Sequence, residues 1–81
     1  MRKFVLTFES HFFALKAKRG LDDSYELSPT PRIVSSSCSS CLIKYYGESC
    51  DIIDIDAFKS LQGLEGIYII DDDRKSVLYE R

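Results

Sequence analysis

The sequence predicts an α+β fold, a two-layer ferredoxin-like sandwich in which two helices cover one face of an antiparallel sheet. Apolar residues alternate with a period of two in several short segments and recur three or four residues apart in two others. The resulting order is strand, helix, strand, strand, helix, strand, with an alternative in which a terminal hairpin adds one more strand. A length of 81 residues gives a single domain, 1–81, with one core.

The first segment, KFVLTFE at 3–9, carries Phe4, Leu6 and Phe8 on one face, as a strand does. Val5 on the other face indicates a strand that is central or covered on both sides. Residues 11–20 then combine apolar and basic side chains in the pattern of an amphipathic helix. Ser10 offers a hydroxyl that can cap the helix start, and Gly20 a C-terminal cap.

A short second strand is predicted at 25–28, and Pro29 and Pro31 then end its pairing because proline cannot donate to a sheet. Residues 29–40 are expected to form a loop, and CLIKYYG at 41–47 resumes a strand. This arrangement places a serine-rich segment with two cysteines directly before the third strand.

The last part of the chain is predicted to hold the second helix and the final strand. Ile52, Ile55, Phe58 and Leu61 fall three residues apart, which favours a helix that is firmest over 54–61 and ends near Gly63. An extended conformation is the alternative for 49–56. GIYIID, the charged turn DDRK and SVLYE close the chain as one strand or as a terminal hairpin.

Composition limits the classes of function. Apolar residues make up 44% of the chain and aromatic residues 12%, which is typical of a folded globule. Eleven basic and thirteen acidic residues give a net charge of −2, without the basic stripe of a nucleic-acid-binding protein; Lys16, Lys18 and Arg19 are interpreted as a solvated helix face. Apolar runs are too short to span a membrane, and the N-terminal residues lack a signal peptide's apolar segment, which predicts a cytoplasmic protein with reduced thiols.

The predicted topology brings the first helix start and the loop at 29–40 to one end of the molecule. A thiol there becomes reactive when positive charge favours its thiolate, and the helix dipole, Arg32 and His11 can supply that charge. Cys38 is therefore the predicted reactive thiol, with Arg32 in support and Cys41 as an alternative resolving thiol. The predicted anion-binding residues around them are Ser10, His11, Pro31, Ser36 and Ser37.

Other interpretations of these residues stay open. Cys38 can equally be a structural residue in a turn, and Cys50 and Tyr68 are interpreted as structural. Zinc would need four ligands, and Cys38 and Cys41 would have to be completed by Cys50 and His11, so no metal site and no cofactor are predicted. A disulfide between Cys38 and Cys41 would make the chain a thiol redox sensor.

Three stretches, FVLTFESHFFALKAK, LSPTPRIVSSSCSSCLIKYY and GLEGIYII, resemble the selenium/sulfur carrier protein-like family of small, functionally uncharacterised bacterial domains. Thr7, Phe8 and Ala14 match its strand end and helix alanine, Pro29 through Arg32 its PTPR element, and Cys38 its cysteine. The sequence departs from the family in Ser39, where glycine is common, and in Cys41, which is outside the family pattern. The resemblance implies a carrier that holds sulfur or selenium on Cys38, with Arg32 stabilising the anion.

The predicted function is accordingly a sulfur or selenium carrier rather than a stand-alone enzyme, with donor and acceptor proteins as partners. The alternative is a non-catalytic protein-interaction or regulatory module, in which the sheet docks a partner or SVLYE offers an edge strand to a second copy in a homodimer. Neither nucleic acid nor a membrane is expected as a partner.

Overall fold

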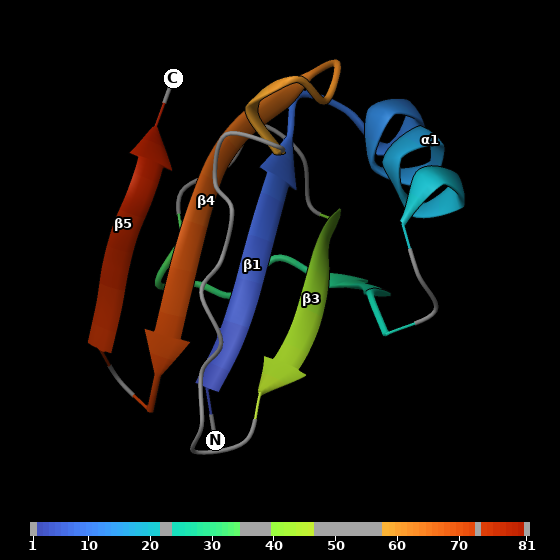
Figure 1. Ribbon diagram of the computed structural model, residues 1–81. Helices are drawn as coiled ribbons and strands as arrows, with labels where there is room; N and C mark the ends of the chain where they lie inside the picture. The colour runs from blue at the N-terminus through green and yellow to red at the C-terminus, as the bar shows by residue number, and fades with distance from the viewer. Residues whose placement is uncertain (1, 22–23, 35–39, 47–57, 73, 81) are drawn as a thin grey trace.

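The computed structural model describes residues 2–21, 24–34, 40–46, 58–72 and 74–80, which form one antiparallel sheet and one helix (Figure 1). In chain order the elements are β1 (Arg2–Phe8), α1 (His11–Gly20), β2 (Glu26–Pro29), β3 (Ser40–Tyr46), β4 (Leu64–Asp71) and β5 (Arg74–Glu80). The strands lie side by side in the order β2-β3-β1-β4-β5, and every neighbouring pair is antiparallel.

The predicted ferredoxin-like α+β sandwich with two helices is wrong, because the described residues form a mostly β structure of five strands and one short helix. Most of the second predicted helix lies outside the described residues. Its described end is helical at Phe58 and Lys59 and closes with a turn in which the Leu61 N–H donates to the Phe58 carbonyl at 3.0 Å. Phe58 and Leu61, which share the predicted three-residue apolar spacing, both pack against the core.

The strand β1 lies at the centre of the sheet, paired with β3 on one side and β4 on the other. Its residues 4–8 are fully buried. Alternation sends Phe4, Leu6 and Phe8 to the face that α1 covers and Val5 to the opposite face. The prediction of a strand that is central or covered on both sides is therefore confirmed, and both descriptions hold.

The core on the α1 face combines residues of the sheet, the helix and the turn at 58–61. Ala14 and Ala17 are the buried residues of α1, and the helix packs over β1, β2 and β3. Phe58 reaches the same core from the turn, where its ring meets the Phe4 ring edge-on at a centroid distance of 5.3 Å. The turn and α1 thus cover different parts of one face (Figure 1).

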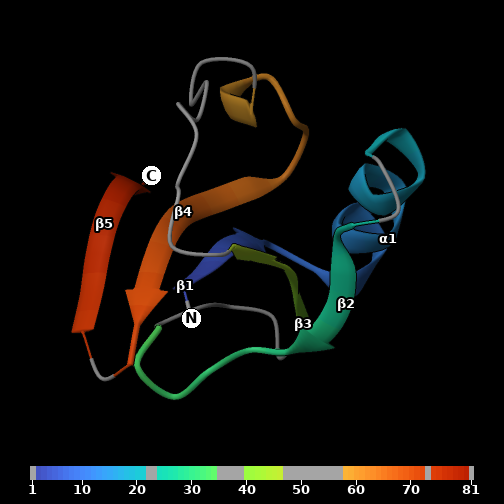
Figure 2. The same ribbon diagram turned by 60° about the horizontal axis from the view of Figure 1, so that its bottom comes forward.

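The opposite face holds a second buried cluster, formed by Val5, Val34, Cys41, Ile43, Tyr68 and Ile70. Val34 comes from the segment that follows β2, which runs beneath the sheet in Figure 2. Its N–H donates to the Pro31 carbonyl at 3.0 Å, closing a turn that holds Val34 against the strands. Part of the predicted loop at 29–40 therefore covers this face.

The ends of the elements show where local conformation departs from the predicted caps. Gly20 is the last residue of α1 and not its cap; the cap is Leu21, whose N–H donates to the Lys18 carbonyl at 3.3 Å. Positive φ angles occur instead at Gly63, with 79°, and at Asp72, with 56°. Gly63 lies in the turn before β4 and Asp72 in the turn of the β4–β5 hairpin, so the hairpin alternative for the C-terminal segment is the one that forms.

Candidate functional site

The start of α1 meets the start of β3 at one end of the sheet. The imidazole Nδ1 of His11 lies 3.3 Å from the Ser40 hydroxyl oxygen, within hydrogen-bonding distance. Ser40 also pairs with Pro29 at the end of β2. The structure thus joins one predicted site residue, His11, to the end of the serine-rich segment, as the sequence predicts for these two parts of the chain.

Ser40 and Cys41 are neighbours in β3 and point to opposite faces of the sheet, as successive strand residues do. The Ser40 side chain meets α1, whereas Cys41 belongs to the buried cluster on the opposite face. Cys41 is fully buried, and its thiol points at the Pro29 carbonyl oxygen at 3.8 Å. A resolving thiol needs access to its partner, so burial leaves Cys41 in a structural position in this conformation.

The N-terminus of α1 is electropositive and has no side-chain capping hydrogen bond. Ser10 occupies the N-cap position with an extended backbone, φ −151°, but its side chain makes no capping hydrogen bond. No acidic residue lies in the first helical turn. The predicted cap position is therefore right and the predicted hydroxyl cap wrong, and the first backbone N–H groups keep their positive potential toward this end of the sheet.

Pro31 and Arg32 lie in the turn on the other side of the sheet from α1. Arg32 is exposed, and it makes no hydrogen bond or ion pair with another residue in the described ranges. This turn is anchored through Val34 on the face that α1 does not cover, and the hydrogen bond of His11 in the described residues is with Ser40 and with neither Pro31 nor Arg32.

The central thiol prediction falls outside the described ranges. Cys38, Ser36 and Ser37 belong to 35–39, and Cys50 belongs to 47–57. The zinc alternative depends on two of these residues. In the part of the chain that is described, no three His, Cys, Asp or Glu side chains are grouped to hold a metal ion, and no helix there is long and apolar enough to span a membrane.

Tyr68 is the described titratable side chain whose chemistry the fold alters most clearly. Burial raises the pKa of its phenol above 10.0, the charge of Glu80 adds to the rise, and a hydrogen bond with Thr7 acts in the opposite direction. The ring lies over Gly66, on the face away from α1. This position makes Tyr68 a packing residue of that face, in agreement with its interpretation from sequence.

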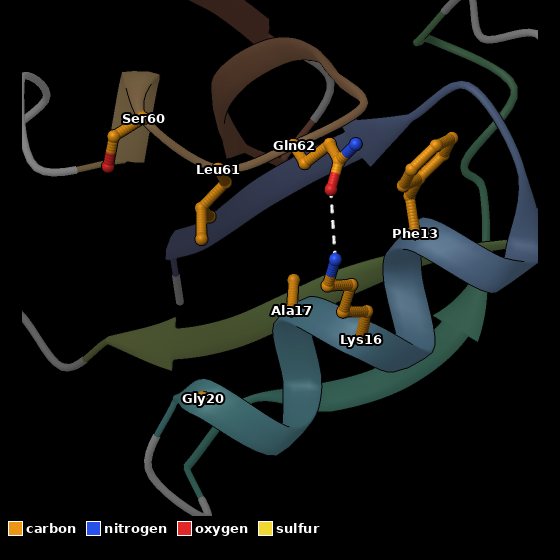
Figure 3. A pocket seen from close by; sticks show the side chains of 7 residues that line it. All are labelled: Phe13, Lys16, Ala17, Gly20, Ser60, Leu61 and Gln62. Carbon is orange, nitrogen blue, oxygen red and sulfur yellow. Dashed lines mark hydrogen bonds between the residues drawn. The ribbon is translucent and has the colours of Figure 1, made fainter.

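A groove between α1 and the turn at 58–62 is a feature that the sequence does not reveal (Figure 3). It has a volume of about 300 Å³. Phe13, Ala17 and Leu61 supply apolar walls, and Lys16 donates to the Gln62 side-chain oxygen across it at 2.9 Å. The sequence could not reveal this groove, because Lys16 and its partner Gln62 lie 46 residues apart in the chain. From sequence, Lys16 was interpreted as part of a solvated helix face.

Comparison of the chain with protein-family models, with curated proteins and with solved structures gives no match.

Proposed function

We propose that this chain is a thiol carrier that accepts sulfur or selenium on Cys38 and passes it to a partner protein. The observation that supports the proposal is the contact between His11 and Ser40. Ser40 follows Cys38 by two residues in the sequence, so this contact favours a position of Cys38 close to the start of α1. A thiolate or persulfide anion near this helix end would be stabilised by the dipole and the N–H groups of the first turn.

The transfer is an exchange between sulfur atoms. The Cys38 thiolate attacks the outer sulfur of a donor persulfide, a new S–S bond forms on Cys38, and the donor's S–S bond breaks to release the donor as a thiolate. One thiolate is consumed and one is produced, so no external oxidant or reductant is needed. An acceptor thiolate reverses the sequence by attacking the outer sulfur of the Cys38 persulfide, which releases Cys38 as a thiolate.

The first test measures ionisation of Cys38 through its alkylation rate at several pH values, with modified peptides separated by mass spectrometry. The proposal expects half-maximal reactivity below about pH 8.5, the value of an ordinary thiol. His11→Gln should slow sulfur uptake, whereas Lys75→Gln, a change on the distant strand β5, should leave it unchanged. Arg32→Gln measures whether that side chain adds to the effect.

The second test is transfer itself. Incubation with a small persulfide donor should add one sulfur atom to the Cys38 peptide, and Cys38→Ser should abolish the gain while Cys41→Ala retains it. An ordinary titration of Cys38 together with no sulfur gain would overturn the carrier proposal.

A second candidate function is a protein-interaction module, favoured by apolar side chains that α1 exposes. Phe12 is 66% exposed and Leu15, one turn further along, is 37% exposed. Side chains of this size on a single helix face are typical of protein contact surfaces when they lie together. This candidate is independent of any cysteine.

A further inference from the structure

The groove beside α1 has apolar walls and a charged edge. Phe13 and Ala17 project from the helix, Leu61 points toward Ala17 from the segment before β4, and the Lys16–Gln62 hydrogen bond lies between Leu61 and Phe13 (Figure 3). The volume of about 300 Å³ is at the small end for ligand sites and is large enough for one apolar side chain of a bound segment. The groove therefore fits an anchor residue better than a whole cofactor.

Among the described residues that line the groove, the charged side chain is a cation, Lys16. The helix α1 carries three basic residues and no acidic one. Lys18 donates to the Tyr25 carbonyl at 3.2 Å and Arg19 is exposed, which leaves Lys16 as the cation at the groove itself. Among the described residues, Lys16 Nζ binds a neutral acceptor, the Gln62 amide oxygen. A carboxylate is a stronger acceptor for an ammonium group, so the groove edge is complementary to an acidic side chain.

Phe12 extends the apolar surface outward from the groove. Its ring packs edge-on against the Phe13 ring, with centroids 5.4 Å apart, and most of its surface remains exposed. A small molecule lying in the groove would leave this outward-facing ring uncovered. A protein segment passing over α1 would cover the groove and the Phe12 ring together. The exposed ring therefore favours a protein segment over a small molecule as the occupant.

We propose that the groove and Phe12 form a docking surface for an acidic segment of a partner protein. An apolar side chain of that segment packs against Leu61 and Ala17, and a neighbouring Asp or Glu takes the place of the Gln62 oxygen on Lys16. The inference rests on the interaction-module function and gives it a surface and a partner chemistry; it does not depend on Cys38. The carrier assays read sulfur on Cys38 and the following experiment reads peptide binding, so the two proposals fail separately.

The probe is the capped peptide acetyl-Leu-Glu-Leu-Glu-amide, compared with acetyl-Leu-Gln-Leu-Gln-amide, titrated into the isotope-labelled full chain and followed by backbone NMR shifts. The acidic peptide should shift residues around Phe13, Ala17 and Leu61, with weaker binding as salt rises. Lys16→Gln should weaken it about ten-fold, the loss of one charge-assisted hydrogen bond. Phe12→Ala should also weaken it, whereas Lys75→Gln should not.

Equal affinity for the two peptides would overturn the proposal of an acidic partner, because Lys16 would then not distinguish glutamate from glutamine. Shifts confined to residues away from α1 and the turn at 58–62 would overturn the surface. If the NMR shifts of the groove residues depend on protein concentration when no peptide is present, the groove binds a second copy of this chain and the proposal of an acidic partner is wrong. Both variants on α1 change exposed side chains, so loss of binding with an unchanged spectrum is attributable to docking.

Discussion

The ring of Phe13 fills the space into which a side chain at position 63 would project. A Cβ on Gly63 would lie 2.7 Å from the Phe13 Cβ and closer still to its ring. Gly63 also has φ 79°, and its carbonyl accepts the Glu9 N–H at 2.8 Å. One glycine thus holds together the end of β1, the helix α1 and the turn before β4.

Gly63→Ala should destabilise the fold by about 3 kcal/mol, because it adds left-handed backbone strain to a steric clash. Urea unfolding followed by circular dichroism measures the change. The double variant with Phe13→Ala separates the two causes: removal of the ring should relieve the clash and leave the strain, so the two effects should not add. Strict additivity would show that Phe13 does not constrain this position.

The free energy of unfolding should fall above pH 10.0 through Tyr68. Because burial raises the pKa of this phenol in the folded state, the unfolded chain releases the proton first as pH rises. The unfolded state then binds fewer protons than the folded state, and the slope of stability against pH is negative from the ordinary value of 10.0 up to the folded value. Below this window the stabilisation is fully present.

Urea unfolding at a series of pH values from neutral to alkaline measures the effect, with Tyr68→Phe as the matched variant. A phenylalanine ring has no hydroxyl to ionise, so the variant should lose less stability than the wild type over the same pH interval. Parallel curves for the two proteins would contradict the buried phenol as the source.

Cys41→Ser should cost more stability than Cys41→Ala. The serine hydroxyl replaces a weakly polar thiol in a fully buried position and, having a shorter bond to Cβ, does not reach the Pro29 carbonyl that the sulfur faces at 3.8 Å. We expect a loss of about 2 kcal/mol for serine and about 1 kcal/mol for alanine. Alkylation in native and denaturing conditions provides a second readout: Cys41 should react readily only when the chain unfolds, and rapid native labelling would contradict its burial.

The strands were largely predictable because successive side chains of a strand point to opposite faces of the sheet, so that apolar residues recur with a period of two. Phe4, Leu6 and Phe8 identify the α1 face of β1, and Val5 identifies a covered second face. The same alternation, applied from Leu42, assigns Cys41 to the face away from α1. The three-residue spacing of Phe58 and Leu61 identifies two residues that face the α1-side core, while most of the second predicted helix lies outside the described residues.

The candidate sites were predictable only where the chain order dictates proximity. His11 and Ser40 meet because a strand, a helix and an antiparallel return place their ends together. Arg32 follows Pro31 into a turn on the opposite face, which depends on the packing of Val34 and has no local signature. The groove depends on the contact between Lys16 and Gln62. These residues lie far apart in the chain, and the local sequence around either one gives no sign of the contact.

Gly20→Ala should stabilise the protein by about 0.5 kcal/mol. Gly20 ends α1 without a positive φ, and a Cβ there would meet no atom within 4 Å, so alanine fits the native backbone. The gain comes from the unfolded chain, where alanine has less conformational freedom to lose than glycine. Urea unfolding of Gly20→Ala and Gly63→Ala side by side provides an internal control, because the same substitution should raise the free energy of unfolding at position 20 and lower it at position 63. Destabilisation at position 20 would mean that this residue supplies a left-handed cap after all and that α1 ends one residue earlier.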